Sequence, residues 1–175
     1  AEIRAAYRSY EFHQIYQKVH NFCAVDLGAF YLDVIKDRQY TTRSDSRARR
    51  SAQTALYHLD EALARWVAPI LSFTAEDIWK HIPGQRGESV FLEEWYDGLP
   101  SSDAASNEGA KIALLETWNP VIEARVVVSK ELEKLRVDGA IGSSLDAEVD
   151  LYCGGKLYQN LGNLGDELRF VLITS

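Results

Sequence analysis

The residues with the clearest chemical potential in this sequence are basic. Six lysines and arginines fall within residues 36–50, although the chain as a whole carries a formal net charge of −7. Arginine presents a planar fork of N–H donors that matches phosphate oxygens, and Gln39 and Tyr40 add an amide and a ring that can meet an unstacked base. We call residues 36–50 the basic stretch and interpret it as a surface for a nucleic acid backbone, while DNA, RNA and an acidic protein all stay open as ligands. Its candidate binding residues are Lys36, Arg38, Tyr40, Arg43, Arg47, Arg49 and Arg50.

The position of three of these arginines is unusual for a helix. If a helix starts near Asp45, its first turns hold Arg47, Arg49 and Arg50, where the helix dipole makes a cation unfavourable by about 0.3–1 kcal/mol. An external anion would complete such a site, because the first N–H groups of a helix point outwards. The alternative is a solvated helix end in which nearby aspartates pair with the arginines.

No active site is evident elsewhere in the sequence. It contains no glycine-rich phosphate loop, no Cys-x-x-Cys pair and no nucleophile elbow. Asp33 and Asp37 share a helical face, but adjacent basic residues favour ion pairing over acid–base catalysis. Four histidines occur singly. Cys23 and Cys153 stand in apolar patterns, and we expect buried thiols rather than a disulfide or a metal site.

Charge and composition limit the class of protein. Residues 1–50 hold nine basic against six acidic residues, whereas residues 81–175 hold eight against sixteen, so a polyanion would be directed to one surface. No apolar run reaches the ~18 residues that span a bilayer, and the N-terminus lacks the order of a signal peptide. We expect a cytoplasmic monomer. The absence of methionine and the apolar ending "LRFVLITS" favour a piece of a longer protein.

Hydrophobic periodicity predicts a mainly α fold, an antiparallel helical bundle followed by a small α/β appendage. The predicted domains are a helical bundle over 1–100, a linker and long helix over 101–140, and an α/β unit over 141–175. Helices are expected over 9–23, 27–40, 45–67, 74–82 and 119–138, the fourth with Thr74 and the fifth with Asn119 as N-cap. Strands are expected over 147–153 and 168–175, on either side of a short helix. The apolar stripe of the third helix contains Leu56, Leu59 and Leu63, which should face the core.

Several segments resemble the anticodon-binding region of bacterial isoleucyl-tRNA synthetases. They are "FYLDVIKDRQYT", "RRSAQTALYHLDEALARWVAPILSFTAEDIW", "FLEEWYDGLP" and "GDELRFVLITS", and together they span most of the chain in order. The piece "APILSFTAEDIW" also resembles the valyl and leucyl relatives. In this family the region is a helical bundle with a small α/β extension that holds the anticodon side of tRNA. The resemblance therefore implies that the basic stretch faces tRNA.

The same resemblance implies what other parts of a parent enzyme would do. The parent would join isoleucine to its tRNA through an ATP-dependent adenylate, with magnesium as a cofactor and with zinc as in many bacterial members of the family. The family's catalytic signatures and zinc-binding cysteines do not occur here, so this chain should need no cofactor and should not aminoacylate, and its partners would be tRNA and the missing catalytic and editing domains. Around "KLRVDGAIGSSLDA", further tRNA contacts are implied for Arg136, Ser143 and Ser144.

Two other interpretations remain open at this level. The chain could be a helical protein-interaction module whose basic stretch docks an acidic partner, and exposed Trp95, Tyr96 and Leu99 would favour this. Alternatively, the basic stretch could tie the bundle to a catalytic domain. A bundle fold does not decide between these functions, because bundles support many of them.

Overall fold

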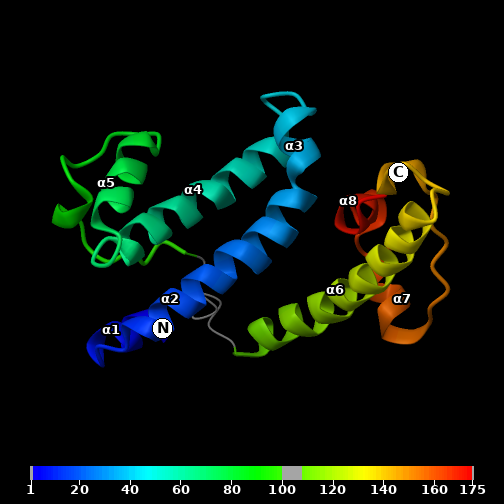
Figure 1. Ribbon diagram of the computed structural model, residues 1–175, viewed down its shortest axis with the longest axis horizontal. Coiled ribbons are helices and arrows are strands. Elements are labelled where there is room, and N and C mark those ends of the chain that lie inside the picture. Colours follow the sequence, from blue (N-terminus) through cyan, green and yellow to red (C-terminus); the bar gives the residue numbers. More distant parts are fainter. Residues whose placement is uncertain (1, 100–107, 175) are drawn as a thin grey trace. The chain divides into compact units, whose positions relative to one another are not determined.

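A computed structural model describes residues 2–99 and 108–174 of the chain (Figure 1). All regular elements in these two ranges are helical, which confirms the prediction of a mainly α fold. The chain divides into two compact units, Ala1–Ser101 and Ser102–Ser175. The longest helix of the first unit is 21 residues, and the second unit begins with a helix of 30 residues.

The described part of the first unit is a succession of helices joined by short connections. In chain order it contains α1 (Glu2–Arg8), α2 (Phe12–Asn21), the π-helix η1 (Phe22–Leu32), α3 (Lys36–Tyr40), α4 (Arg47–Val67), α5 (Ser72–His81) and the 3-10 turn η2 (Val90–Leu92). Figure 1 shows α2, η1 and α3 following one another in a nearly unbroken run, with α4 returning in the opposite direction. This arrangement is consistent with the predicted antiparallel bundle.

The π-helix η1 is a feature that the sequence did not predict. Its N–H groups bond five residues back, so the backbone winds more widely than in an α-helix and different side chains share a face. A Cβ atom at Gly28 would lie 2.9 Å from the carbonyl oxygen of Cys23, which restricts this position to glycine. Because η1 buries none of its residues, Cys23 is exposed and the expectation of a buried thiol was wrong there. Cys153 is half-buried.

The core of the first unit lies where α4 meets α5. Small side chains let the two helices approach closely, since Ala64 and Ala75 are both fully buried, and Trp79 fills the space beside them. The indole Nε1 of Trp79 donates a hydrogen bond to the carbonyl oxygen of Gly87 over 3.1 Å, so the segment after α5 folds back over the ring. The same cluster also contains Val67, Ala68, Ile82 and Val90.

Helix α4 begins at Arg47, two residues after the predicted start at residue 45, and Ser46 is its N-cap. Its buried face differs from the predicted apolar stripe, because the buried residues are Ala52, Glu61, Ala62, Ala64 and Val67. The three predicted core leucines are only half-buried. Helix α5 begins at Ser72, earlier than the predicted Thr74 cap, because Leu71 ends the tight turn from α4 and its carbonyl accepts the first bond from Ala75.

The second unit packs short helices against one long helix. It contains α6 (Glu108–Val137), the 3-10 turn η3 (Ser144–Asp146), α7 (Gly155–Gly162), the 3-10 turn η4 (Gly165–Glu167) and α8 (Leu168–Leu172). Val128 and Leu132 of α6 form a core with Ala147 and Leu172. Helix α6 ends before Gly139, as predicted, and this glycine adopts a φ of +72° that favours a residue without Cβ.

The predicted α/β appendage is wrong for the described residues of this unit. Residues 147–153 contain no strand, and the apolar segment near the C-terminus forms helix α8. The alternation of the first segment arises because Ala147 and Val149 pack on α6, so one face is buried against a helix rather than a sheet. The predicted start of the long helix at residues 119–120 was also wrong, since Pro120 lies inside α6.

Candidate nucleic-acid interface

The basic stretch forms the turn between α3 and α4. Figure 1 shows these two helices meeting at their shared connection, and three hydrogen bonds tie them together. The Thr42 hydroxyl donates to the carbonyl oxygen of Arg38 over 2.7 Å, the Ser46 hydroxyl donates to Thr42 Oγ1 over 3.1 Å, and the Arg49 backbone N–H donates to Ser46 Oγ over 3.3 Å. This chain of hydroxyls fixes the end of α3 on the start of α4, which gives the basic side chains a defined support.

Most of the predicted binding residues point into solvent. Lys36, Tyr40, Arg43, Arg47 and Arg50 are exposed, and the Tyr40 side chain is among the most accessible aromatic groups at 82%. Exposed aromatic rings beside cations are suited to stacking with unpaired bases. The structure therefore brings five of the predicted residues to one helix–turn–helix element.

Ion pairing accounts for only part of this positive charge. Arg43 binds Asp45 through two hydrogen bonds, Nε–Oδ1 at 3.2 Å and Nη2–Oδ2 at 3.1 Å. Within residues 2–99, the side chains of Lys36, Arg47 and Arg50 make no ion pair or hydrogen bond. Three cations thus remain available to an anion from outside the unit.

Two residues of the basic stretch have a different role from the one expected. Arg49 is half-buried, and its Nη1 donates to the carbonyl oxygen of Thr42 over 3.2 Å, so this side chain holds the connection against α4. Its Nε is buried without an acceptor. The side-chain nitrogen of Gln39 is buried as well, and it is therefore withdrawn from a base at the surface. Arg38 is half-buried at the end of α3.

The predicted residues of the second unit already have partners within that unit. Arg136 binds Glu133 through two hydrogen bonds of 2.7 and 2.6 Å, and the Arg136 guanidinium lowers the pKa of this exposed carboxyl. Ser143 is the N-cap of η3 in a capping box with Asp146, and Ser144 is half-buried. Contact of Arg136, Ser143 and Ser144 with tRNA stays a prediction.

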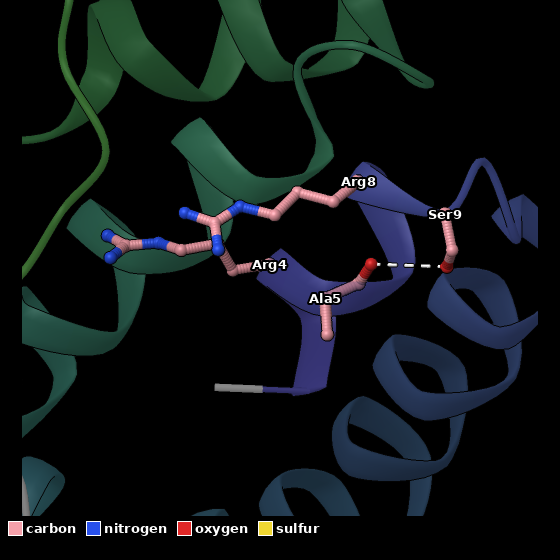
Figure 2. Close-up of a pocket in the computed structure, with 4 residues that line it drawn as sticks. All are labelled: Arg4, Ala5, Arg8 and Ser9. Atoms are coloured by element: carbon pink, nitrogen blue, oxygen red, sulfur yellow. Dashed lines mark hydrogen bonds between the residues drawn. The ribbon is translucent and has the colours of Figure 1, made fainter.

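A second basic pair lies on α1, where the sequence analysis proposed no site. Figure 2 shows the side chains of Arg4 and Arg8 extending to the same side of this helix, around an open pocket. Arg4 binds Asp97 over 2.7 Å and lies 5.0 Å from the ring centre of Trp95, whereas Arg8 is exposed. The spacing of four residues between the two arginines was the available sign in the sequence. Because Arg4 is already paired, this pocket is a weaker anion site than the basic stretch.

A buried charge network stabilises the opposite end of α4. Glu61 is only 3% exposed and binds both Arg65 and Arg86. The two guanidinium groups each lie 4.5 Å from the ring centre of Trp79. Burial by itself raises the pKa of Glu61, but hydrogen bonds from Arg86, Arg65 and Tyr57 outweigh it and leave the pKa below its ordinary value. Glu61 is therefore ionised and has a structural role.

The aromatic residues that could have marked a protein-docking surface are held within the unit. Trp95 stacks on Trp66 with ring centres 5.6 Å apart, and the hydroxyl of Tyr96 lies 2.5 Å from His58 Nδ1. Both are half-buried, as is Leu99. These contacts remove the observation that would have favoured a protein-interaction module.

Neither a metal site nor a membrane span occurs in the part of the chain that the structure describes. No group of three or more histidine, cysteine, aspartate or glutamate side chains there could hold a metal ion. Among the described helices, none combines the length and the apolar character needed to cross a bilayer.

The described part of the first unit is thus a helical unit with an exposed basic turn between α3 and α4. The chain belongs to the family of the anticodon-binding domain of tRNA ligases, which matches residues 1–151. It is 63% identical to the isoleucine–tRNA ligase of Nitrosococcus oceani and 60% identical to that of Alkalilimnicola ehrlichii. It is 58% identical to the isoleucine–tRNA ligase of Methylococcus capsulatus. Each of these matches covers 99% of this chain but only 18% of the relative.

Proposed function

We propose that this chain binds the anticodon side of a tRNA that accepts isoleucine. In this proposal it positions the tRNA for ATP-dependent aminoacylation by catalytic and editing domains outside these 175 residues. The family match and the names of the similar relatives support the proposal. ATP with magnesium, and zinc where a parent enzyme contains it, would be bound by those other parts.

The observation that carries the proposal is the set of three exposed cations on the α3–α4 turn. Lys36, Arg47 and Arg50 have no acidic partner among the described residues of their unit. Arg47 and Arg50 also stand in the first turn of α4, where the helix dipole repels a cation. Such an arrangement is unfavourable in the free protein, and RNA phosphates would relieve it by supplying the missing negative charge.

The alternative of an ion-paired helix end fits Arg43, which binds Asp45, but it leaves Lys36, Arg47 and Arg50 without an acidic partner among the described residues of their unit. The alternative of an acidic protein partner would use the same cations. It differs from RNA binding in one measurable way, because binding to an acidic protein would not depend on base structure.

A binding comparison tests the proposed function. The 175-residue chain is titrated with isoleucine tRNA, with valine and leucine tRNAs, and with duplex DNA, each at two salt concentrations. We expect the tightest binding to isoleucine tRNA and a loss of affinity as salt rises, since bound phosphates release counterions. Equal affinity for the isoleucine, valine and leucine tRNAs would support only tRNA binding typical of the wider synthetase family, without selectivity for isoleucine tRNA. Absence of binding to every tRNA would overturn the proposal.

A further inference from the structure

An open pocket on α4 lies directly beyond the basic stretch. It has a volume of about 510 Å³, and its lining includes Arg50, Gln53, Thr54, Tyr57, Asp60 and Pro83. All but Pro83 come from α4. Arg50 is shared between the basic stretch and this pocket, which we call the α4 pocket. The pocket therefore begins where the proposed phosphate contacts end.

Side chains along this face of α4 change from basic to polar to aromatic to acidic. Arg47, Arg50, Gln53, Tyr57 and Asp60 follow one another at intervals of three or four residues, which places them on one side of the helix. About 10 Å of helix separates the Cα atoms of Arg50 and Tyr57, at 1.5 Å per residue. A nucleotide could thus contact an arginine with its phosphate and the ring of Tyr57 with its base.

The polar groups of the pocket are available to a ligand. Gln53 and Asp60 are exposed, and their side chains make no hydrogen bond within residues 2–99. Thr54 donates its hydroxyl proton to the carbonyl oxygen of Arg50 over 2.8 Å and keeps its oxygen free to accept. An amide can both donate to and accept from the edge of a base, and a carboxylate accepts from an exocyclic amino group.

The ring of Tyr57 is held in place before any ligand arrives. It remains 39% exposed, while the guanidinium of Arg86 lies 5.8 Å from its centre and the His58 ring packs edge-on at 5.7 Å. Its hydroxyl also helps to lower the pKa of the buried Glu61. A fixed aromatic ring loses little conformational freedom when a base stacks on it.

We propose that the α4 pocket takes one unstacked, amino-bearing nucleobase of single-stranded RNA, whose adjoining phosphates lie on Arg47 and Arg50. Tyr57 stacks with the base, and Gln53 and Asp60 bind its edge. The inference rests on the proposed function, because it needs RNA on the basic stretch. The α4 pocket would add a base-recognition site to a surface that otherwise binds the RNA backbone.

The test uses the 175-residue chain and an RNA stem-loop, compared with the same stem-loop made abasic at one loop nucleotide at a time. Gln53→Ala is the informative variant, because this exposed side chain supports no other residue. Gln17→Ala on α2 is the matched control, since Gln17 is also exposed. We expect one abasic position to weaken binding by roughly ten-fold.

Gln53→Ala should weaken binding of the intact stem-loop. It should not further weaken binding of the stem-loop that is abasic at the sensitive nucleotide, because the contact is already lost there. Gln17→Ala should leave both affinities unchanged. Replacement of the same nucleotide by 2-aminopurine should give fluorescence that is quenched on binding, and Tyr57→Leu should remove the quenching.

Failure of this inference differs from failure of the proposed function. If the chain binds the stem-loop but no abasic position weakens binding, or if Gln53→Ala acts equally on intact and abasic RNA, the α4 pocket holds no base while RNA binding stands. If the chain binds no RNA stem-loop and no tRNA, both proposals are overturned.

Discussion

Ser46 caps helix α4 by accepting a hydrogen bond from the backbone N–H of Arg49 over 3.3 Å. The same hydroxyl donates to Thr42, so this one side chain connects the start of α4 with the end of α3. The exposed cations on either side depend on this connection for their relative positions.

Replacement of the cap should loosen the turn. Ser46→Ala removes both hydrogen bonds, and loss of an N-cap typically costs about 0.5–2 kcal/mol. We expect a lower free energy of unfolding in denaturant titrations, whereas Ser46→Asp should retain most of the stability because aspartate also caps helices. Equal stability of Ser46→Ala and the parent chain would mean that the cap does not hold the turn.

The exposed arginines should act on binding rather than on stability. Arg47→Gln or Arg50→Gln should reduce the slope of log affinity for tRNA against log salt by roughly 0.7–0.9 each. Stability should rise by about 0.3–1 kcal/mol, because a cation leaves a helix N-terminus. Lys134→Gln is the matched control, since Lys134 is exposed and paired with Glu131 outside the basic stretch. An unchanged slope in both arginine variants would show that this stretch does not contact phosphates.

Arg49 should behave in the opposite way to its neighbours. Because its side chain binds the carbonyl oxygen of Thr42, Arg49→Gln should lower the melting temperature. Loss of a hydrogen bond from a charged group costs about 1.5–3 kcal/mol. Thermal unfolding of Arg49→Gln and Arg50→Gln side by side distinguishes the supporting residue from the exposed one, and a melting temperature that rises in both would contradict the assignment.

The buried carboxylate should make the first unit sensitive to acid. The pKa of Glu61 is lowered in the folded state, so its stabilising contribution is complete above the ordinary carboxyl pKa and is lost as pH falls through the folded value. Glu61→Gln should flatten this loss and destabilise the unit at neutral pH by about 3–5 kcal/mol, since Arg86 stays buried without this carboxylate and Arg65 keeps only its longer contact with Glu93. Unfolding measured from pH 7 downwards provides the comparison.

Asp60 should change the stability of the chain with pH in the opposite direction to Glu61. Although the residue is exposed, partial burial of the Asp60 carboxyl and the neighbouring charge of Glu61 raise its pKa against the attraction of Arg86, so folding disfavours its ionised form. Stability from this group therefore increases as pH falls through the raised pKa. Asp60→Asn should stabilise the chain slightly at neutral pH and make the acid loss steeper, and a shallower loss would contradict the assignment.

The chain should not catalyse the chemical step of aminoacylation. It contains no adenylate-forming signature, and its described residues contain no cluster that could hold a metal ion. We expect no exchange of labelled pyrophosphate into ATP when isoleucine is added. If pyrophosphate-exchange activity co-purified with the chain through successive columns, the chain would be catalytic.

Much of the first unit followed from local sequence. The apolar periodicity of residues 45–67 predicted α4 to within two residues at its start, and the helix predicted over 74–82 ends, as α5 does, shortly before Pro83, because periodicity and proline geometry act within a few residues. The clustering of basic residues also indicated the surface proposed to bind RNA. These features depend on chemistry that neighbouring residues carry with them.

Other features required the tertiary structure. The alternation of apolar and polar residues over 147–153 predicted a strand. It indicates only that one face of the segment is buried, and in the structure this face packs on α6. Likewise, the sequence does not reveal that Arg49 supports the turn while Arg47 and Arg50 stay exposed to solvent. Nor does it reveal that Glu61 and Arg86, which are 25 residues apart in the chain, form an ion pair. Sequence determines which groups a helix can offer. Long-range packing decides which of them are buried, paired or left to a ligand, because burial and charge depend on neighbours distant in the chain.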